Sequence, residues 1–154
     1  MVGITGGIAA YKIAELIRLL QKEGAEVKVV LTEHASKFVS LTTLSTVTKN
    51  RVYRDLFGLE QTFDPEHISL TQWADLLLIA PATANIIGKA ATGIADDLLS
   101  TIILAMSKPV VFAPAMNGRM YCNPIVQENI AKLQQLGYDF IEPAEGELLC
   151  GESG

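Results

Sequence analysis

The sequence predicts an α/β fold in which a doubly wound, mainly parallel sheet carries helices on both faces. Residues 76–80 and 109–113 form short apolar runs without polar alternation, which is typical of parallel strands that are buried on both faces. Strand-like runs and helix-like segments alternate along the whole chain. Such alternation specifies a doubly wound sheet of the Rossmann or flavodoxin-like kind.

Length and composition predict one domain over 1–154 and limit its partners. Hydrophobic residues make up 49% of the chain and charged residues 19%, which favours an oligomer that buries apolar surface, although a well-filled core fits too. The net charge of −5 and the lack of a Lys/Arg cluster argue against nucleic acid or an acidic membrane as a partner. With neither a signal peptide nor an apolar run of about 20 residues, a cytoplasmic protein without membrane contact is expected.

The chain is predicted to begin with a strand over 1–5, a turn at Gly6 and Gly7, and a helix over 8–23 that Gly24 closes. Glycines before a helix N-terminus let a backbone approach a phosphate. These glycines do not form G-x-G-x-x-G, however, and no Walker lysine follows. A turn that binds nothing therefore fits these residues equally well.

The next part of the chain is less regular, up to the central strand over 76–80. Its predicted elements are a strand over 26–31 that ends at Thr32, short helices over 35–39 and 41–47, an edge strand at 52–53, a loop over 58–65 and a helix over 67–74.

Two similar loops follow the strands over 76–80 and 109–113. The first reads Ala80-Pro81-Ala82-Thr83-Ala84-Asn85 and the second Ala113-Pro114-Ala115-Met116-Asn117. Pro81 is expected to end its strand, because it has no N–H to donate. Ligands of open α/β sheets bind outside the carboxyl ends of the strands, so the two loops are predicted to form two walls of one site.

The second half is predicted to contain three helices and a last strand. Asp96 is the expected N-cap of an apolar helix over 97–106, whose burial could involve another subunit. The remaining elements are a helix over 85–91 before Gly93, a helix from Pro124 with Asn123 as N-cap, a strand over 139–142 and a small polar segment over 146–154, a candidate flap.

Three residues are candidates for chemistry. His67 is a natural proton acceptor at neutral pH, although a histidine at the start of a helix can simply bond to the backbone. Asn117 can donate two N–H bonds to a carboxylate, or act as an N-cap. Cys150 can supply a proton or a thiolate, although a lone cysteine is more often inert. No two of the histidines and cysteines lie at ligand spacing, so no metal site is expected.

Six motifs in order carry a resemblance that covers essentially the whole chain. They are Gly6-Gly7-Ile8-Ala9-Ala10-Tyr11-Lys12, His67-Ile68-Ser69-Leu70, Trp73-Ala74-Asp75, Ala80-Pro81-Ala82-Thr83-Ala84-Asn85, Pro114-Ala115-Met116-Asn117-x-x-Met120 and Leu149-Cys150-Gly151. The set resembles the homo-oligomeric flavin-containing cysteine decarboxylases. Within that family it is most similar to the members that act on 4′-phosphopantothenoylcysteine in coenzyme A biosynthesis.

The resemblance implies bound FMN and an oxidative decarboxylation. In the family the flavin oxidises the substrate's cysteine to a thioaldehyde, CO₂ leaves, and the reduced flavin returns hydride. By motif, His67 is the base, Asn117 holds the departing carboxylate with Met120 and Leu149 beside the substrate, and Cys150 on the flap donates a proton. The residues implied to lie near FMN are Gly6, Gly7, Ile8, Thr32, Thr83, Ala84, Asn85 and Ala115.

The family assembles as trimers or dodecamers with flavin between subunits. Two other functions stay open: a peptidyl-cysteine decarboxylase of the lantibiotic type, which shares the His and Asn motifs, and a flavin-binding regulatory subunit. The motif at Leu149-Cys150-Gly151 argues against the first, and the lack of a long acidic tail argues against the second. Glu152 stands where the family usually has Asp after Cys-Gly.

Overall fold

The computed structural model describes residues 1–56 and 66–142, and within them six strands form one parallel sheet in the order β3-β2-β1-β4-β5-β6. Winding outward in both directions from β1 and β4 is the Rossmann arrangement, so the predicted fold class is confirmed. The strands are β1 (Val2–Ile4), β2 (Val29–Leu31), β3 (Val52–Tyr53), β4 (Leu77–Ala82), β5 (Val110–Pro114) and β6 (Asp139–Phe140).

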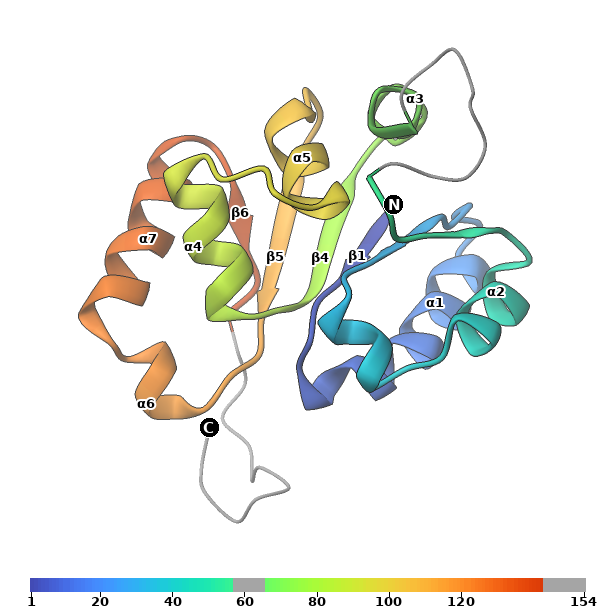
Figure 1. Cartoon of the computed structure of the whole chain (residues 1–154), viewed down its shortest axis with the longest axis horizontal. Helices are drawn as coiled ribbons and strands as arrows, with labels where there is room; N and C mark the ends of the chain where they lie inside the picture. Colours follow the sequence, from blue (N-terminus) through green and yellow to red (C-terminus); the bar gives the residue numbers. More distant parts are fainter. Residues whose placement is uncertain (57–65, 143–154) are drawn as a thin grey trace.

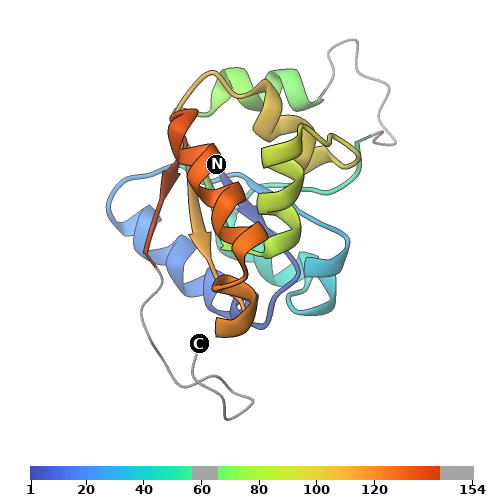
Figure 2. The same cartoon turned by 90° about the vertical axis from the view of Figure 1, so that its left-hand side faces the viewer.

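Helices cover both faces of this sheet: α1 and α2 lie on one side of the strands and α4 and α7 on the other (Figure 1). Turned by 90°, the molecule shows α7 and α4 in front of the strands (Figure 2). The described helices are the 3₁₀ segments η1 (Ile8–Lys12) and η2 (His34–Lys37), with α1 (Ile13–Lys22), α2 (Leu41–Thr48), α3 (Glu66–Trp73), α4 (Ala84–Thr92), α5 (Leu98–Ala105), α6 (Gly118–Tyr121) and α7 (Pro124–Gln135).

Side chains of β2 alternate between two apolar cores. Val29 and Leu31 pack with α1 and α2, whereas Val30 packs in the core that contains α5. On β1 the α5 side is occupied by Gly3, where an added Cβ would lie 2.5 Å from Leu99 Cδ1. The missing side chain therefore lets α5 approach the sheet closely, and this chain itself buries most of that helix.

Pro81 does not end its strand, contrary to the expectation. β4 continues to Ala82, and its register against β5 shifts between Ile79 and Ala82. Between these positions two residues of β4 oppose one of β5, which forms a β-bulge. A proline can occupy a bulge because no N–H is needed there for a hydrogen bond between the strands.

The N-cap of α5 is Asp97 and not the expected Asp96. Asp97 Oδ1 accepts the N–H of Ser100 at 2.8 Å, and Ser100 Oγ accepts the N–H of Asp97 at 3.1 Å, which forms a reciprocal capping box. Leu99, three residues after Asp96, could not have returned such a bond. Asp96 binds Lys89 instead, at 2.6 Å.

The remaining differences concern element ends. The helix predicted over 8–23 begins as 3₁₀ turns, because Ala10 N–H donates to Gly7 O at 2.9 Å, three residues back. The short helix predicted at 35–39 is the 3₁₀ segment η2, β6 is shorter than 139–142, and α6 was not predicted. The loop over 58–65 and the flap over 146–154 lie outside the described residues. None of the described helices could span a membrane.

Candidate functional site

The sheet reverses its winding between β1 and β4, so the chain leaves these two neighbours toward opposite faces. A crevice between the departing loops is where open α/β sheets bind ligands. Thr5, at the end of β1, joins the two sides: its Oγ1 donates to Pro81 O at 2.6 Å and accepts the N–H of Thr83 at 3.2 Å. Thr5 is not among the residues predicted to lie near FMN, although a polar residue at the end of a buried strand is a signal for such a position.

Three loops converge at Gly7. A Cβ placed on Gly7 would lie 3.7 Å from Thr83 Cγ2, 3.8 Å from Pro81 Cγ and 3.9 Å from Ala115 O. The turns after β1, β4 and β5 thus meet within van der Waals distance, and the structure brings Gly7, Thr83 and Ala115 together. Ile8, the next residue, is 54% exposed.

The N-terminus of α4 opens beside this meeting point. Thr83 is its N-cap in extended backbone geometry, yet the Thr83 side chain makes no capping hydrogen bond. The hydroxyl lies 3.3 Å from Thr5 Oγ1 instead. The N–H groups of Ala84 and Asn85 in the first turn therefore receive no bond from the cap side chain and can bind acceptor oxygens of a ligand.

Gly6 is where the loop after β2 reaches the loop after β1. A Cβ on Gly6 would lie 2.5 Å from His34 Cβ and 3.0 Å from the backbone carbon of His34. Thr32 Oγ1, just before, donates to Ile4 O at 3.2 Å. Gly6 and Thr32 thus hold the turns after β1 and β2 against each other at the edge of the crevice.

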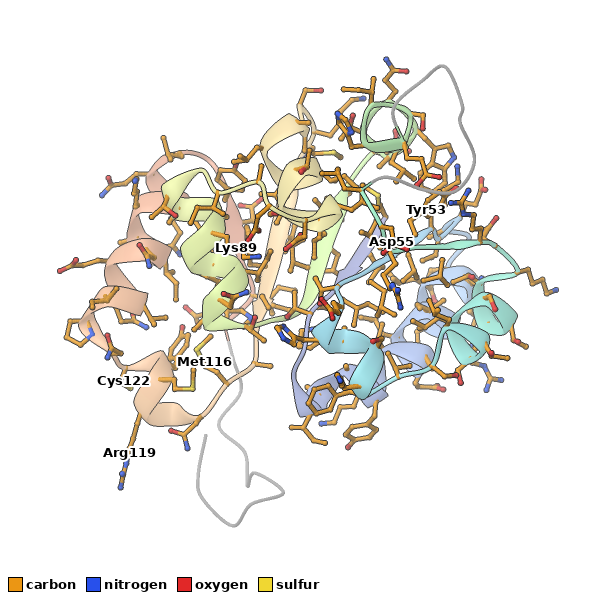
Figure 3. The ribbon with its side chains drawn as sticks, viewed as in Figure 1. Tyr53, Asp55, Lys89, Met116, Arg119 and Cys122 are labelled. Carbon is orange, nitrogen blue, oxygen red and sulfur yellow. The ribbon has the colours of Figure 1, made fainter. Side chains whose placement is uncertain are left out.

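Asn117 follows the end of β5 and caps α6. Its Oδ1 accepts the N–H of Arg119 at 2.9 Å, so Asn117 is the N-cap of α6 and this bond fixes the direction of its side chain. Met120, in α6, is 50% exposed. Figure 3 shows Met116 and Arg119 in this part of the molecule.

His67 lies far from these residues in the same chain. It belongs to α3, which sits at the amino end of β4 near the N-terminus, whereas α6 lies at the other end of the strands (Figure 1). The length of β4 separates the two ends by about 17 Å at ~3.3 Å per residue. The structure therefore does not bring His67 and Asn117 together within one chain.

Lys89 lies on α4 (Figure 3). It binds both carboxylates that precede α5. Its Nζ lies 2.6 Å from Asp96 Oδ1 and 2.7 Å from Asp97 Oδ2. Burial disfavours the charged forms, but these hydrogen bonds outweigh it, so the pKa of Lys89 is raised above 10.5 and that of Asp97 is lowered below 3.8. The sequence did not predict this cluster, which fastens α4, and with it Thr83, to α5.

We expect Lys89→Met to lower the free energy of unfolding by about 2 kcal/mol, since hydrogen bonds to charged groups contribute roughly 1.5–3 kcal/mol. Asp97 has a depressed pKa, so its stabilisation is present above pH 3.8 and is lost as the pH falls through the folded-state value. Lys89 has a raised pKa, so its part is present below pH 10.5 and is lost as the pH rises past the folded-state value. Urea unfolding at several pH values measures this difference, with Lys132→Met as an exposed control. A loss that stays constant as the pH falls further and further below 3.8 would contradict it.

A cavity of about 220 Å³ adjoins the crevice. It is lined by Leu31, Thr32, Glu33, Arg54, Asp55, Leu56, Asp96, Asp97, Leu98 and Leu99. In residues 1–56 and 66–142 no cluster of three or more His, Cys, Asp or Glu could hold a metal ion. Leu149 and Cys150 lie outside the described residues, so their roles stay predictions.

A family model described as Flavoprotein matches residues 1–154. This chain belongs to the flavoprotein family. The coenzyme A biosynthesis bifunctional protein CoaBC of Bacillus subtilis (strain 168) is 50% identical over 151 residues, which are 98% of this chain and 37% of that protein. The chain thus spans less than two fifths of the length of this bifunctional relative.

Two further relatives resemble the chain along most of their own length. A probable phosphopantothenoylcysteine decarboxylase of Streptococcus mutans serotype c is 42% identical over 100% of this chain and 87% of that protein. The solved structure of a PPC decarboxylase Cys-to-Ser mutant, complexed with pantothenoylaminoethenethiol, superposes with a TM-score of 0.87 at 35% identity and covers 99% of this chain and 86% of that one. The resemblance to the cysteine decarboxylases is thereby confirmed.

Proposed function

We propose that this flavoprotein binds FMN in the crevice at the carboxyl ends of β1 and β4 and decarboxylates 4′-phosphopantothenoylcysteine to 4′-phosphopantetheine. The observation that carries the proposal is the convergence of Gly7, Thr83 and Ala115 within 4 Å at the switch point of the sheet. These are residues that the motifs assigned to FMN from three separate parts of the sequence. The similarity to a relative named for this decarboxylation supports the choice of substrate.

The residues at the crevice fit FMN. The open N-terminus of α4 offers N–H donors, the hydroxyl of Thr83 is not used in capping, and Gly7 presents no side chain. Such groups suit the oxygens of a phosphate, a ribityl chain or a flavin ring. Asn85 and Ile8 are exposed beside them, and Gly6 and Thr32 hold the adjoining turns in place.

Each proposed catalytic residue has one task. Bound FMN would supply the two-electron oxidation that labilises the carboxylate and the reduction that follows. His67 accepts a proton from the substrate, which is the task of a general base. Asn117 has Oδ1 committed to the Arg119 N–H, and we assign its amide Nδ2 to the departing carboxylate. Cys150 returns a proton, and Met120 and Leu149 contact the substrate.

We propose a cytoplasmic homo-oligomer, trimeric or dodecameric, and the position of His67 supports a site shared between copies of the chain. One chain holds the FMN residues and Asn117 at the carboxyl ends of the strands and His67 at the amino ends. A complete site is obtained when α3 of one copy docks at the crevice of the next. Apolar side chains are exposed at both places: Ile68 and Leu76 beside His67, and Ile8 and Met120 beside the crevice.

The test is anaerobic incubation of the purified protein with 4′-phosphopantothenoylcysteine, with flavin absorbance and product mass followed together. We expect a product lighter by one CO₂ and a flavin that returns to its oxidised spectrum. A yellow protein that leaves this substrate unchanged would contradict the substrate and favour a peptidyl cysteine instead. A colourless protein that FMN does not reconstitute would contradict the cofactor as well.

A further inference from the structure

The first turn of α3 carries His67 but has little apolar anchorage. Ile68 and Ser69 are exposed, and His67 itself is only half-buried. The first fully buried side chains of the helix are those of Leu70 and Thr71, one turn later. Packing against the core therefore holds the second turn more firmly than the turn from which the imidazole projects.

An ion pair fastens this first turn to the edge of the sheet. Arg51, just before β3, places its guanidinium 2.7 Å from Glu66 Oε1 at the start of α3. The Glu66 side chain is only 15% exposed. The Arg51 guanidinium also lies over the ring of Tyr53, 5.2 Å from its centroid, which fixes its direction. Arg51 thus connects the residue directly before His67 to a strand of the sheet.

The ion pair leaves one oxygen of the Glu66 carboxylate without a hydrogen bond in the described part of the chain. This second oxygen, Oε2, is buried. Buried polar atoms of this kind are rare, and each calls for a reason. Stability alone would be served as well by an apolar contact, because a buried charge is costly to desolvate.

We propose that Arg51 and Glu66 are positioning residues, whose ion pair sets the direction in which α3 presents the His67 imidazole. The inference rests on the proposed role of His67 as the base. A proton acceptor must lie within hydrogen-bond reach of its substrate, and a displacement of 1 Å can lower a rate about 10²-fold. A loosened first turn would displace the imidazole while Leu70 still anchors the helix.

Four variants test the pair by activity. Glu66→Gln and Arg51→Met are expected to lower kcat roughly 10- to 100-fold, with FMN affinity and KM unchanged. Arg51→Lys keeps the charge and should retain most of the activity, and Glu15→Gln, an exposed glutamate in the first turn of α1, is the matched control. In a His67→Asn background Glu66→Gln should change turnover no further, because both act through the same imidazole. An undiminished kcat in Glu66→Gln would overturn the proposal. So would losses of kcat that are equal in Arg51→Lys and Arg51→Met.

A second measurement does not depend on turnover. The sequence has two histidines, so imidazole NMR resonances report His67 with the exposed His34 as an internal reference. We expect the His67 resonances to shift or broaden in Glu66→Gln while those of His34 stay in place. Unchanged His67 resonances would contradict the positioning role. If the His67 resonances change in Glu66→Gln but the native protein does not decarboxylate the substrate, the proposed function fails while the positioning of His67 by Glu66 is still supported.

Discussion

Mixing two inactive variants, His67→Asn and Asn117→Asp, is expected to restore decarboxylase activity. His67 and Asn117 lie at opposite ends of the strands in one chain (Figure 1), so a complete site takes one residue from each of two copies. Asp at 117 keeps an oxygen for the Arg119 N–H but replaces the amide donor by a charge that repels a carboxylate. His67→Asn alone should lose at least ~10²-fold in kcat, because loss of a general base typically costs about 10²–10⁴-fold. Asn117→Asp alone should also be inactive, because its carboxylate repels that of the substrate.

Co-expression of the two variants with different tags supplies mixed oligomers for the assay. With random assembly into a ring of identical interfaces, roughly a quarter of the sites combine an intact His67 with an intact Asn117. Mixtures of either variant with itself should stay inactive, and FMN content should be unchanged throughout. If the purified mixed oligomers stayed inactive, a site that spans two copies would be excluded.

The placement of His67 opposite to Asn117 follows from the order of helices and strands in the sequence. The predicted helix over 67–74 directly precedes the strand over 76–80, so in a parallel sheet it must lie at the amino ends of the strands. Asn117 follows a strand and must lie at the carboxyl ends. Chain order therefore predicts their separation once the strands are known to be parallel.

Local sequence rules predicted elements better than their exact ends. Asn123 with Pro124 correctly predicted the start of α7, because cap and proline act within one turn. Asp96 and Asp97 are adjacent potential caps, and the choice between them depends on Ser100 and on Lys89 from another helix. The prediction that Pro81 ends its strand is wrong, because the bulge that accommodates it needs β5 as a partner. The contact between Gly6 and His34 likewise joins two loops that no local rule connects.

That contact gives the second large effect: we expect Gly6→Ala to destabilise the protein by about 2 kcal/mol, as overpacking typically does, and to weaken FMN binding at least ~10-fold. The new methyl would meet His34 Cβ at 2.5 Å and the His34 backbone carbon at 3.0 Å, so η2 must move away from the turn after β1. Thr32 is two residues from His34 and would move with it. The crevice would then lose the arrangement that we assign to FMN.

Gly88→Ala, in the middle of α4, is the matched control, because within the described part of the chain its Cβ would meet only Asn129 Nδ2, at 3.9 Å. Alanine is the better helix former, so this variant should be neutral or more stable. Thermal unfolding of the FMN-free protein and quenching of flavin fluorescence measure the two effects. The double variant Gly6→Ala/His34→Gly removes the Cβ contact but leaves the backbone contact, so it should recover only part of the stability. If the double variant recovers no stability, the clash of the new methyl is with the backbone of η2. If Gly6→Ala alone binds FMN as tightly as the native chain, the close approach of the loops after β1 and β2 does not matter for the cofactor.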